Sequence, residues 1–251
     1  MRYGRRKMAT FPTILWLLLA VVSMTTRAEV PAERQVMLQL VRDSVRESAS
    51  YTGIAELSDK VMAAMGAVPR EAFVLPEYQH LAYRNAPLPI KAGQTISQPL
   101  IVALMTELLD PQPGDVILEV GTGSGYQAAI LSEIVRHVYT VEVIPSLASS
   151  AGNRLREYGY DNITVHVADG AEGWPAHAPY DGIIVTAATP TVPQVLLQQL
   201  QVGGRLVIPL GHHTQTQELT VIEKLADGSC RSEQILAVRF VPLTHGSSTV
   251  S

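Results

Sequence analysis

The sequence predicts an α/β fold with one mostly parallel β-sheet and an antiparallel hairpin at its C-terminal end. From residue 116 onward, short apolar runs rich in Val and Ile alternate with segments whose apolar residues recur at helical spacing. This alternation is typical of a parallel sheet with helices on both faces. Near the C-terminus, two apolar runs flank Asp227 and Gly228, a pair that favours a tight turn between antiparallel strands.

Seven strands are expected in the sheet, at residues 116–120, 137–143, 163–167, 180–186, 204–209, 218–225 and 235–241. The helices between them are expected at residues 126–135, 146–158 and 193–201. A helical N-terminal extension precedes the sheet, with helices at residues 32–48 and 55–65 and a further helix from Pro99 to about Asp110. Pro99 suits a first helical turn because the N–H that proline lacks would have no helical partner there.

The N-terminus has the features of a secretory signal. Four basic residues occur among the first seven, residues 14–22 are apolar, and residues 26–28 (TRA) resemble a small-residue cleavage site. The apolar stretch is shorter than the roughly 20 residues that a membrane span needs. The sequence therefore divides into a signal-like segment, residues 1–28, and one domain, residues 29–251, large enough for a single hydrophobic core.

Charge and cysteine content exclude several functions. The whole chain carries a net charge of −4, and without the five basic residues of segment 1–28 it keeps 14 basic against 23 acidic residues. An acidic domain lacks the basic face that nucleic acid requires, so no nucleic-acid partner is expected. Cys230 is the only cysteine, which excludes an intrachain disulfide, and we expect it in the hairpin turn. No metal is expected, because the histidines lack metal-ligand spacing.

The most informative stretch lies where the first strand of the expected sheet ends. Residues 118–126 read LEVGTGSGY, so the strand passes Glu119 and crosses Gly121, Gly123 and Gly125 before a helix begins. Alternate glycines allow tight turns and a close approach between backbone and ligand. The pattern indicates a nucleoside cofactor at the end of a parallel strand. The alternative is that the glycines serve only close packing of helix against strand.

The glycine loop fits S-adenosylmethionine better than a dinucleotide. A dinucleotide fingerprint has its third glycine, or an alanine, five positions after the first, and that position is Tyr126 here. A phosphate-binding loop ending in Gly-Lys-Ser/Thr is absent. The acid before the first glycine, Glu119, would repel a pyrophosphate but suits the cationic amino group of S-adenosylmethionine.

Two further carboxylates follow neighbouring strands. Glu142 lies 21 positions after Gly121, a spacing at which an acid accepts the ribose hydroxyls of a nucleotide. Asp169 follows the third strand and is placed to accept from an adenine amino group. A lone acid at a strand end is usually a solvated turn residue, but three at the carboxyl edge of one sheet indicate a ligand site.

Motifs along most of the chain resemble those of the protein-L-isoaspartate O-methyltransferases. The resemblance extends from about residue 35 to residue 245 and is most specific at residues 93–99, which read GQTISQP. The other matching segments are the glycine loop and residues 68–74 (VPREAFV), 85–90 (NAPLPI), 185–188 (VTAA), 203–209 (GGRLVIP) and 238–243 (VRFVPL). The chain departs from the family at Ala168, where glycine is common, and we expect little effect unless that position needs a positive φ.

The resemblance implies a class I S-adenosylmethionine-dependent methyltransferase fold, Rossmann-like, with a seven-stranded sheet. Residues 29–98 would form a helical cap and substrate loop, and residues 99–251 the cofactor-binding sheet. The implied activity is methyl esterification of the free α-carboxyl of L-isoaspartyl residues in damaged peptides and proteins, which initiates their repair. D-Aspartyl residues are a further implied substrate class.

The resemblance also implies roles for single residues, with Ser97 as the active-site serine. The implied cofactor-binding residues are Glu119, Gly121, Gly123 and Gly125 at the methionine portion, Glu142 at the ribose, and Asp169 with Gly170 at the adenine. Thr244 matches a position near the cofactor in some relatives, and residues 83–90 and 238–242 are expected along the peptide groove. The alternative role for Ser97 is that of N-cap of the following helix.

No general base is expected, because a substrate carboxylate is already ionised at neutral pH. Catalysis then consists of positioning and desolvation, and we expect Ser97 to hydrogen-bond the substrate or orient the cofactor without acting as a nucleophile. Two alternatives remain open, a non-catalytic exported relative that binds the cofactor and a methyltransferase for another carboxylate. DNA methylation is disfavoured, because neither a Pro-Cys nucleophile nor an Asp/Asn-Pro-Pro-aromatic motif is present.

The expected location is the cytoplasm, where S-adenosylmethionine is made and where the family generally occurs. The signal-like segment instead indicates export, so the periplasm is the alternative. The expected partners are isoaspartyl peptides and proteins, with no stable membrane insertion after processing and a monomeric chain.

Overall fold

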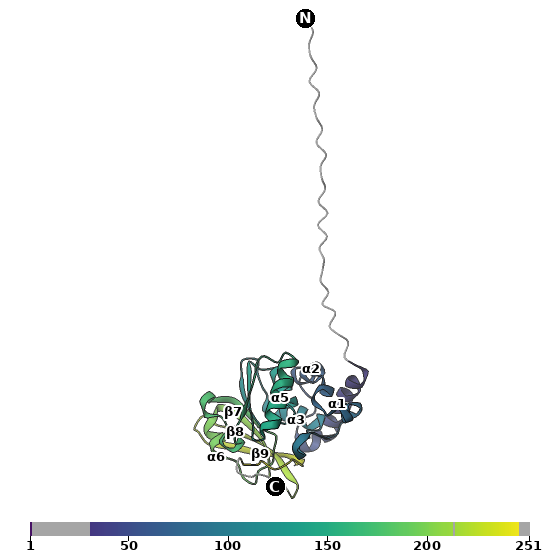
Figure 1. Cartoon of the computed structure of the whole chain (residues 1–251). Helices are drawn as coiled ribbons and strands as arrows, with labels where there is room; N and C mark the ends of the chain where they lie inside the picture. Colours follow the sequence, from purple (N-terminus) through teal and green to yellow (C-terminus); the bar gives the residue numbers. More distant parts are fainter. Residues whose placement is uncertain (2–30, 213, 246–251) are drawn as a thin grey trace.

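A seven-stranded sheet with helices on both faces organises the protein (Figure 1). The structure, a computed structural model, describes Met1, residues 31–212 and residues 214–245. Apart from Met1, the signal-like segment 1–28 lies outside the described residues. No helix in the described ranges is both long and apolar enough to span a bilayer.

The strands of the sheet lie in the order β5-β4-β3-β6-β7-β8-β9. Their bounds are β3 (Val116–Val120), β4 (His137–Glu142), β5 (Ile163–Val167), β6 (Tyr180–Val185), β7 (Leu200–Leu210), β8 (Gln217–Lys224) and β9 (Cys230–Val238). Strands β3 to β7 pair in parallel, whereas β7, β8 and β9 pair antiparallel. The strand order reverses beside β3, and ligands of open α/β sheets bind at the carboxyl edge at such a reversal.

In the described ranges, the α-helices around the sheet are α1 (Ala32–Thr52), α2 (Asp59–Ala67), α3 (Pro99–Leu109), α4 (Tyr126–Ser132), α5 (Pro145–Glu157) and α6 (Gln194–Gln199). Helices α1, α2 and α3 pack against one another beside the sheet (Figure 1). Strand β3 shows how the two faces are filled, because its side chains alternate in direction. Ile117 belongs to the core that includes α1 to α5, and Leu118 and Val120 belong to the core that includes α6.

Short elements between α2 and α3 shape the loops next to the sheet. They are the 3-10 turns η1 (Arg70–Phe73), η2 (Pro76–Leu81) and η3 (Lys91–Gly93) and the two-residue strands β1 (Leu88–Pro89) and β2 (Thr95–Ile96). Strands β1 and β2 pair antiparallel, with Leu88 opposite Ile96. This small ladder holds the segment just before Ser97 in an extended conformation.

The sequence predicted the strands β3 and β5 with their observed bounds, but the end hairpin differs. Strand β9 begins at Cys230, not at residue 235. Its first five residues were not predicted, because residues 230–234 are exposed on the edge strand and carry no apolar pattern. The turn is closed by a 2.8 Å hydrogen bond from Leu225 N–H to Ser229 O. Cys230 therefore lies in an exposed edge strand and not in the turn.

The second helix also begins later than predicted, at Asp59 instead of residue 55. The Glu107 carboxylate on α3 accepts hydrogen bonds of 2.8 Å from both the N–H and the hydroxyl of Ser58. Because these bonds hold Ser58 in an extended conformation, the helix cannot begin before it. The apolar pattern of residues 55–65 gave no sign of this tertiary contact.

Candidate active site

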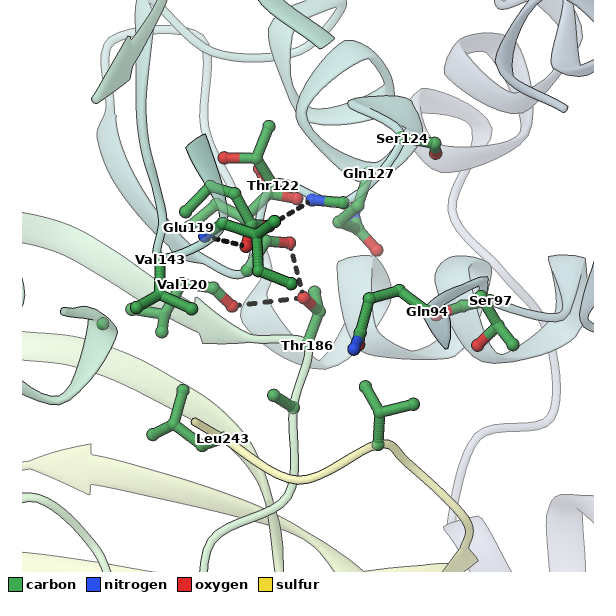
Figure 2. A pocket seen from close by; sticks show the side chains of 18 of the residues that line it. Gln94, Ser97, Glu119, Val120, Thr122, Ser124, Gln127, Val143, Thr186 and Leu243 are labelled. Carbon is green, nitrogen blue, oxygen red and sulfur yellow. Dashed lines mark hydrogen bonds between the residues drawn. The ribbon is translucent and has the colours of Figure 1, made fainter. Parts of the chain in front are cut away.

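A pocket of about 750 Å³ opens at the carboxyl edge of the sheet. Its walls are the glycine loop, the ends of β4 and β6, the loop 94–97 and the segment 241–244. In Figure 2, Glu119, Val120 and Thr122 gather on one wall, and Gln94 and Ser97 approach from the opposite side.

The glycine loop has a backbone that only glycine adopts easily. Gly121, Gly123 and Gly125 have φ angles of +99°, +52° and +87°, a region that side chains disfavour. Gly121 also lies against Thr186, whose hydroxyl would overlap any Cβ at this position. That hydroxyl donates to the Gly121 carbonyl over 2.7 Å and lies 3.1 Å from the Val120 carbonyl, as Figure 2 shows.

Two of the three loop glycines face the pocket. Gly121 and Gly123 line it, whereas Gly125 is the N-cap of α4 and packs against Leu155 of α5. Gly125 therefore turns the chain into the helix behind the loop. The sequence did not separate these two uses of glycine.

Glu119 lies at the pocket with its side chain fully buried. Its Oε2 accepts a 2.5 Å hydrogen bond from the Thr140 hydroxyl, and its Oε1 has no hydrogen-bond partner among the described residues. Burial raises the pKa of the carboxyl to about 8, although the Thr140 bond opposes the increase, and the nearby charge of Glu142 adds to it. A cationic group in the pocket would compensate the desolvated oxygen.

Glu142 joins the end of β4 to the glycine loop. Its Oε2 accepts from Gly123 N–H over 2.9 Å, and its Oε1 accepts from Ile144 N–H over 3.0 Å. Each carboxylate oxygen has a second lone pair, so Glu142 retains the capacity to accept from hydroxyl groups of a ligand. It lines the pocket, as the sequence indicated.

Asp169 lies at the expected strand end, but its side chain is engaged elsewhere. Its Oδ1 accepts from Ala171 N–H over 2.9 Å, and its Oδ2 lies 3.1 Å from His245 Nδ1. Gly170 lines the pocket in its place, where a Cβ would overlap Val120. An adenine contact by Asp169 stays a prediction. The φ of Ala168 is not positive, so alanine replaces the more common glycine there without strain.

Ser97 lies between β2 and α3 and borders the pocket. The N-cap of α3 is Gln98, and no side chain caps this helix, so the alternative N-cap role of Ser97 is wrong. The Ser97 hydroxyl has no hydrogen bond within the described part of the chain. The Ser97 carbonyl is held by Arg70, whose Nη2 donates to it over 2.8 Å.

A second groove, of about 930 Å³, adjoins the pocket and shares Thr95, Ser97, Thr186 and Val241 with it. Residues 238–241 line this groove, whereas Pro242 and Thr244 line the first pocket. Of residues 83–90, only Pro87 lines the groove. For the rest of that segment a place along the peptide groove stays a prediction. Leu88 pairs opposite Ile96 in the ladder of β1 and β2 and belongs to the core.

Sequence reasoning missed Thr186, which lines the site, and two residues that contact lining residues from behind, Thr140 and Arg70. Thr140 carries a usable signal, because it is a polar residue between Tyr139 and Val141 and the parallel register places it opposite Glu119. Arg70 interrupts the apolar run of residues 68–74, yet nothing in the run shows that this charge is fully buried. Among the described residues, no group of His, Cys, Asp and Glu side chains is arranged to hold a metal.

The comparison with protein families identifies the fold. A family model described as Protein-L-isoaspartate(D-aspartate) O-methyltransferase matches residues 44–248. The chain belongs to this family. Membership in the protein-L-isoaspartate O-methyltransferases confirms the resemblance, the fold class and the enzyme class predicted from the motifs.

Relatives that carry the family's name match most of the chain. The Protein-L-isoaspartate O-methyltransferase 2 of Polaromonas sp. (strain JS666) is 51% identical over 208 residues, which are 83% of this chain and 99% of the relative. The Protein-L-isoaspartate O-methyltransferase 2 of Syntrophobacter fumaroxidans is 47% identical over 245 residues, covering 97% of this chain and 99% of the relative.

Solved structures of the family have the same fold. One protein-L-isoaspartate O-methyltransferase is 26% identical with a TM-score of 0.74, over 85% of this chain and 66% of the other. A second, from Plasmodium falciparum and described as in complex with S-adenosyl-L-homocysteine, is 22% identical with a TM-score of 0.70, over 84% of this chain and 98% of the other.

Proposed function

We propose that this protein transfers a methyl group from S-adenosylmethionine to the free α-carboxyl of L-isoaspartyl residues in damaged peptides and proteins, with D-aspartyl residues as a second substrate class. The observation that carries the proposal is the position of Ser97, which borders both the pocket and the adjoining groove. Ligands of these two spaces would meet at its hydroxyl. Family membership supplies the reaction type.

The residues of the pocket fit S-adenosylmethionine. The buried Glu119 oxygen without a partner suits a cationic amino group, and Gly121, Gly123 and Gly170 present backbone without side chains at the pocket wall. We assign Glu119, Gly121 and Gly123 to the methionine portion, with Gly125 supporting the loop, Glu142 to the ribose, and Gly170 with Asp169 to the adenine. The cofactor supplies an electrophilic methyl group on a sulfonium.

The protein's own residues have a positioning role in this reaction. The substrate carboxylate is ionised at neutral pH, so no side chain needs to remove a proton from it. Ser97 donates its free hydroxyl to a carboxylate oxygen and aims the other oxygen into the pocket. The apolar residues Val238 and Phe240 of the groove exclude water from the reacting groups, which strengthens the polar contacts there.

The decisive experiment compares synthetic peptides that differ only at one residue. Purified protein and methyl-labelled S-adenosylmethionine are incubated with a peptide containing L-isoaspartate, the same peptide with normal aspartate, and an isoaspartyl peptide whose α-carboxyl is an amide. We expect a base-labile methyl ester on the first peptide alone. Cofactor binding without methylation would favour the non-catalytic alternative, and labelling of the normal peptide would favour a methyltransferase for other carboxylates.

We infer that the protein acts in the cytoplasm, because the donor of the methyl group is made there. We also infer that it is a monomer. The signal-like segment 1–28 makes export to the periplasm the alternative. N-terminal sequencing of the protein from fractionated cells tests this: an intact N-terminus in the cytoplasmic fraction is expected, and a mature chain beginning near residue 29 in the periplasm would contradict it. Light scattering of the same material measures the oligomeric state.

A further inference from the structure

We propose that Arg70 is a positioning residue for the reaction, because its buried guanidinium fixes the Ser97 backbone relative to the cofactor pocket. The assignment rests on the proposed function, since Ser97 acts there on the substrate carboxylate. Arg70 touches neither pocket nor groove, so its effect on the chemistry passes through Ser97.

The guanidinium of Arg70 joins three separate segments of the chain. Its Nε donates to Ala82 O over 2.8 Å, and its Nη2 donates to Ser97 O over 2.8 Å and to Ala86 O over 3.4 Å. Ala82 and Ala86 precede β1, and Ser97 follows β2, so Arg70 fixes both ends of the segment that contains this small ladder. The planar fork of an arginine suits such divided contacts, and a lysine cannot reproduce them.

The same guanidinium also contacts the cofactor side of the site. Its Cζ lies 4.8 Å from the ring centroid of Tyr126, the first residue of α4 after the glycine loop. Tyr126 lines the pocket. Arg70 thus contacts one residue on the cofactor wall and one on the substrate wall, and it determines their separation.

A fully buried arginine is rare unless it is paired. Arg70 is fully buried, and no carboxylate pairs with it among the described residues. Burial lowers its pKa, and only the tyrosines Tyr126 and Tyr83 oppose the decrease. Burying an unpaired cation is costly. We attribute the presence of a buried arginine at this position to its role in holding the Ser97 carbonyl in place.

Arg34 provides a matched control for the loss of a buried arginine. It is 7% exposed, donates through Nη1 to Gly66 O over 3.0 Å, and lies over the ring of Tyr83 at 5.6 Å. It borders neither pocket nor groove and makes no contact with Ser97. Arg34 also donates through Nε to the Tyr83 hydroxyl over 3.0 Å and pairs with Glu71 at 3.5 Å. Arg34→Lys therefore removes buried hydrogen bonds of another arginine and weakens an ion pair, with no bond to Ser97 among those lost.

The experiment measures Arg70→Lys, Arg70→Gln, Arg34→Lys and the wild type for three quantities: kcat and KM with an isoaspartyl peptide, affinity for S-adenosylhomocysteine, and Tm. For Arg70→Lys we expect kcat/KM to fall about tenfold or more, as for a misplaced hydrogen-bonding group, with the affinity changed less than about twofold. For Arg34→Lys we expect a similar decrease in Tm and kcat/KM within about twofold of the wild type. In a Ser97→Ala background, Arg70→Lys should lower kcat/KM by less than about a further twofold, because both changes act through Ser97.

Each other result has a definite meaning. If the wild type leaves the isoaspartyl peptide unmethylated, the proposed function fails. If the wild type is active and Arg70→Lys equals it, or if activity follows Tm equally in the Arg70 and Arg34 variants, only the assignment of Arg70 fails. Failure of both Arg70 variants to fold would likewise overturn it, because Arg70 would then be a residue of the scaffold.

Discussion

The Thr140 hydroxyl donates to Glu119 Oε2 over 2.5 Å and leaves Glu119 Oε1 without a partner at the pocket. The contact follows from strand pairing, because the parallel register of β3 and β4 places Thr140 directly opposite Glu119. One oxygen of this buried carboxyl is therefore satisfied by the protein, and the other is available to a ligand. Since burial raises the pKa of Glu119 to about 8, the free protein holds this group mostly protonated at neutral pH.

The affinity for the cofactor should therefore depend on pH. A cationic ligand group favours the ionised form of Glu119, so binding below pH 8 requires release of a proton. We expect the affinity for S-adenosylhomocysteine to increase as the pH rises toward the Glu119 pKa of about 8 and to level off above it, by at most about tenfold per pH unit. Calorimetry in buffers of different ionisation enthalpy measures the released proton directly.

Glu119→Gln is the control, because it keeps the shape and cannot ionise. The variant should bind more weakly and release no proton. The pH dependence of folding stability, compared between the wild type and Glu119→Gln, gives a second readout. The folded wild type keeps a proton that the unfolded chain loses above the ordinary pKa of 4.5, so its stability relative to Glu119→Gln falls as the pH rises from 4.5 through 8. A wild-type affinity that is flat over this range would contradict the role of Glu119.

Ser97→Ala should lower turnover while leaving the cofactor site intact. The Ser97 hydroxyl has no partner among the described residues, so its removal costs little folding stability. Loss of a hydrogen bond to a charged substrate group is worth about 1.5–3 kcal/mol, so kcat/KM should fall by roughly 10- to 100-fold. Peptide kinetics, Tm and affinity for S-adenosylhomocysteine are measured together. Full activity with a lowered Tm would exclude the assigned role.

The framework of the site could be predicted from the sequence because backbone geometry determines it. Alternation of apolar runs gave the parallel strands, and acids at their ends gave Glu119 and Glu142 at one pocket. The glycines were readable because their positive φ angles restrict the residue type. These features depend on local patterns and on the rule that parallel strands share an edge.

Other features depend on contacts between distant segments and left no local pattern. Asp169 is engaged by Ala171 and by His245, a residue 76 positions away. Arg70 contacts carbonyls up to 27 positions away, and its burial is invisible in the run VPREAFV. Strand β9 begins with exposed polar residues, because the edge strand needs hydrogen bonds and not an apolar face. Tertiary structure determines each of these.

Gly121→Ala should abolish cofactor binding by steric conflict within the loop. Gly121 has a φ of +99°, and an added Cβ would overlap the Thr186 hydroxyl. Gly159→Ala is the matched control, because Gly159 has a φ of +78° with no atom within 4 Å of an added Cβ. Both changes carry a backbone cost of about 1 kcal/mol or more, so both should lower Tm. Only Gly121→Ala should lose affinity for S-adenosylhomocysteine, and equal affinities in the two variants would refute a role of the glycine loop in cofactor binding.

Arg239 should favour acidic side chains next to the isoaspartyl residue. It is the only charged residue among those lining the groove in the described part of the chain, and it is exposed and forms no ion pair there. Peptides with Glu beside isoaspartate should therefore have a higher kcat/KM than the same peptides with Gln, by about two- to fivefold for an exposed charge pair. The preference should decrease in high salt because such pairs are screened.

The preference should reverse in Arg239→Glu, because the acidic peptide would then meet a like charge. Arg231→Glu is the control, since Arg231 lies on β9, which ends just before Arg239, and outside the groove, where it pairs with Glu223. It makes the same change in net charge and should retain the wild-type preference. Identical ratios of kcat/KM for the Glu and Gln peptides in the wild type and Arg239→Glu would show that flanking charges do not reach Arg239, and would place the bound peptide away from this part of the groove.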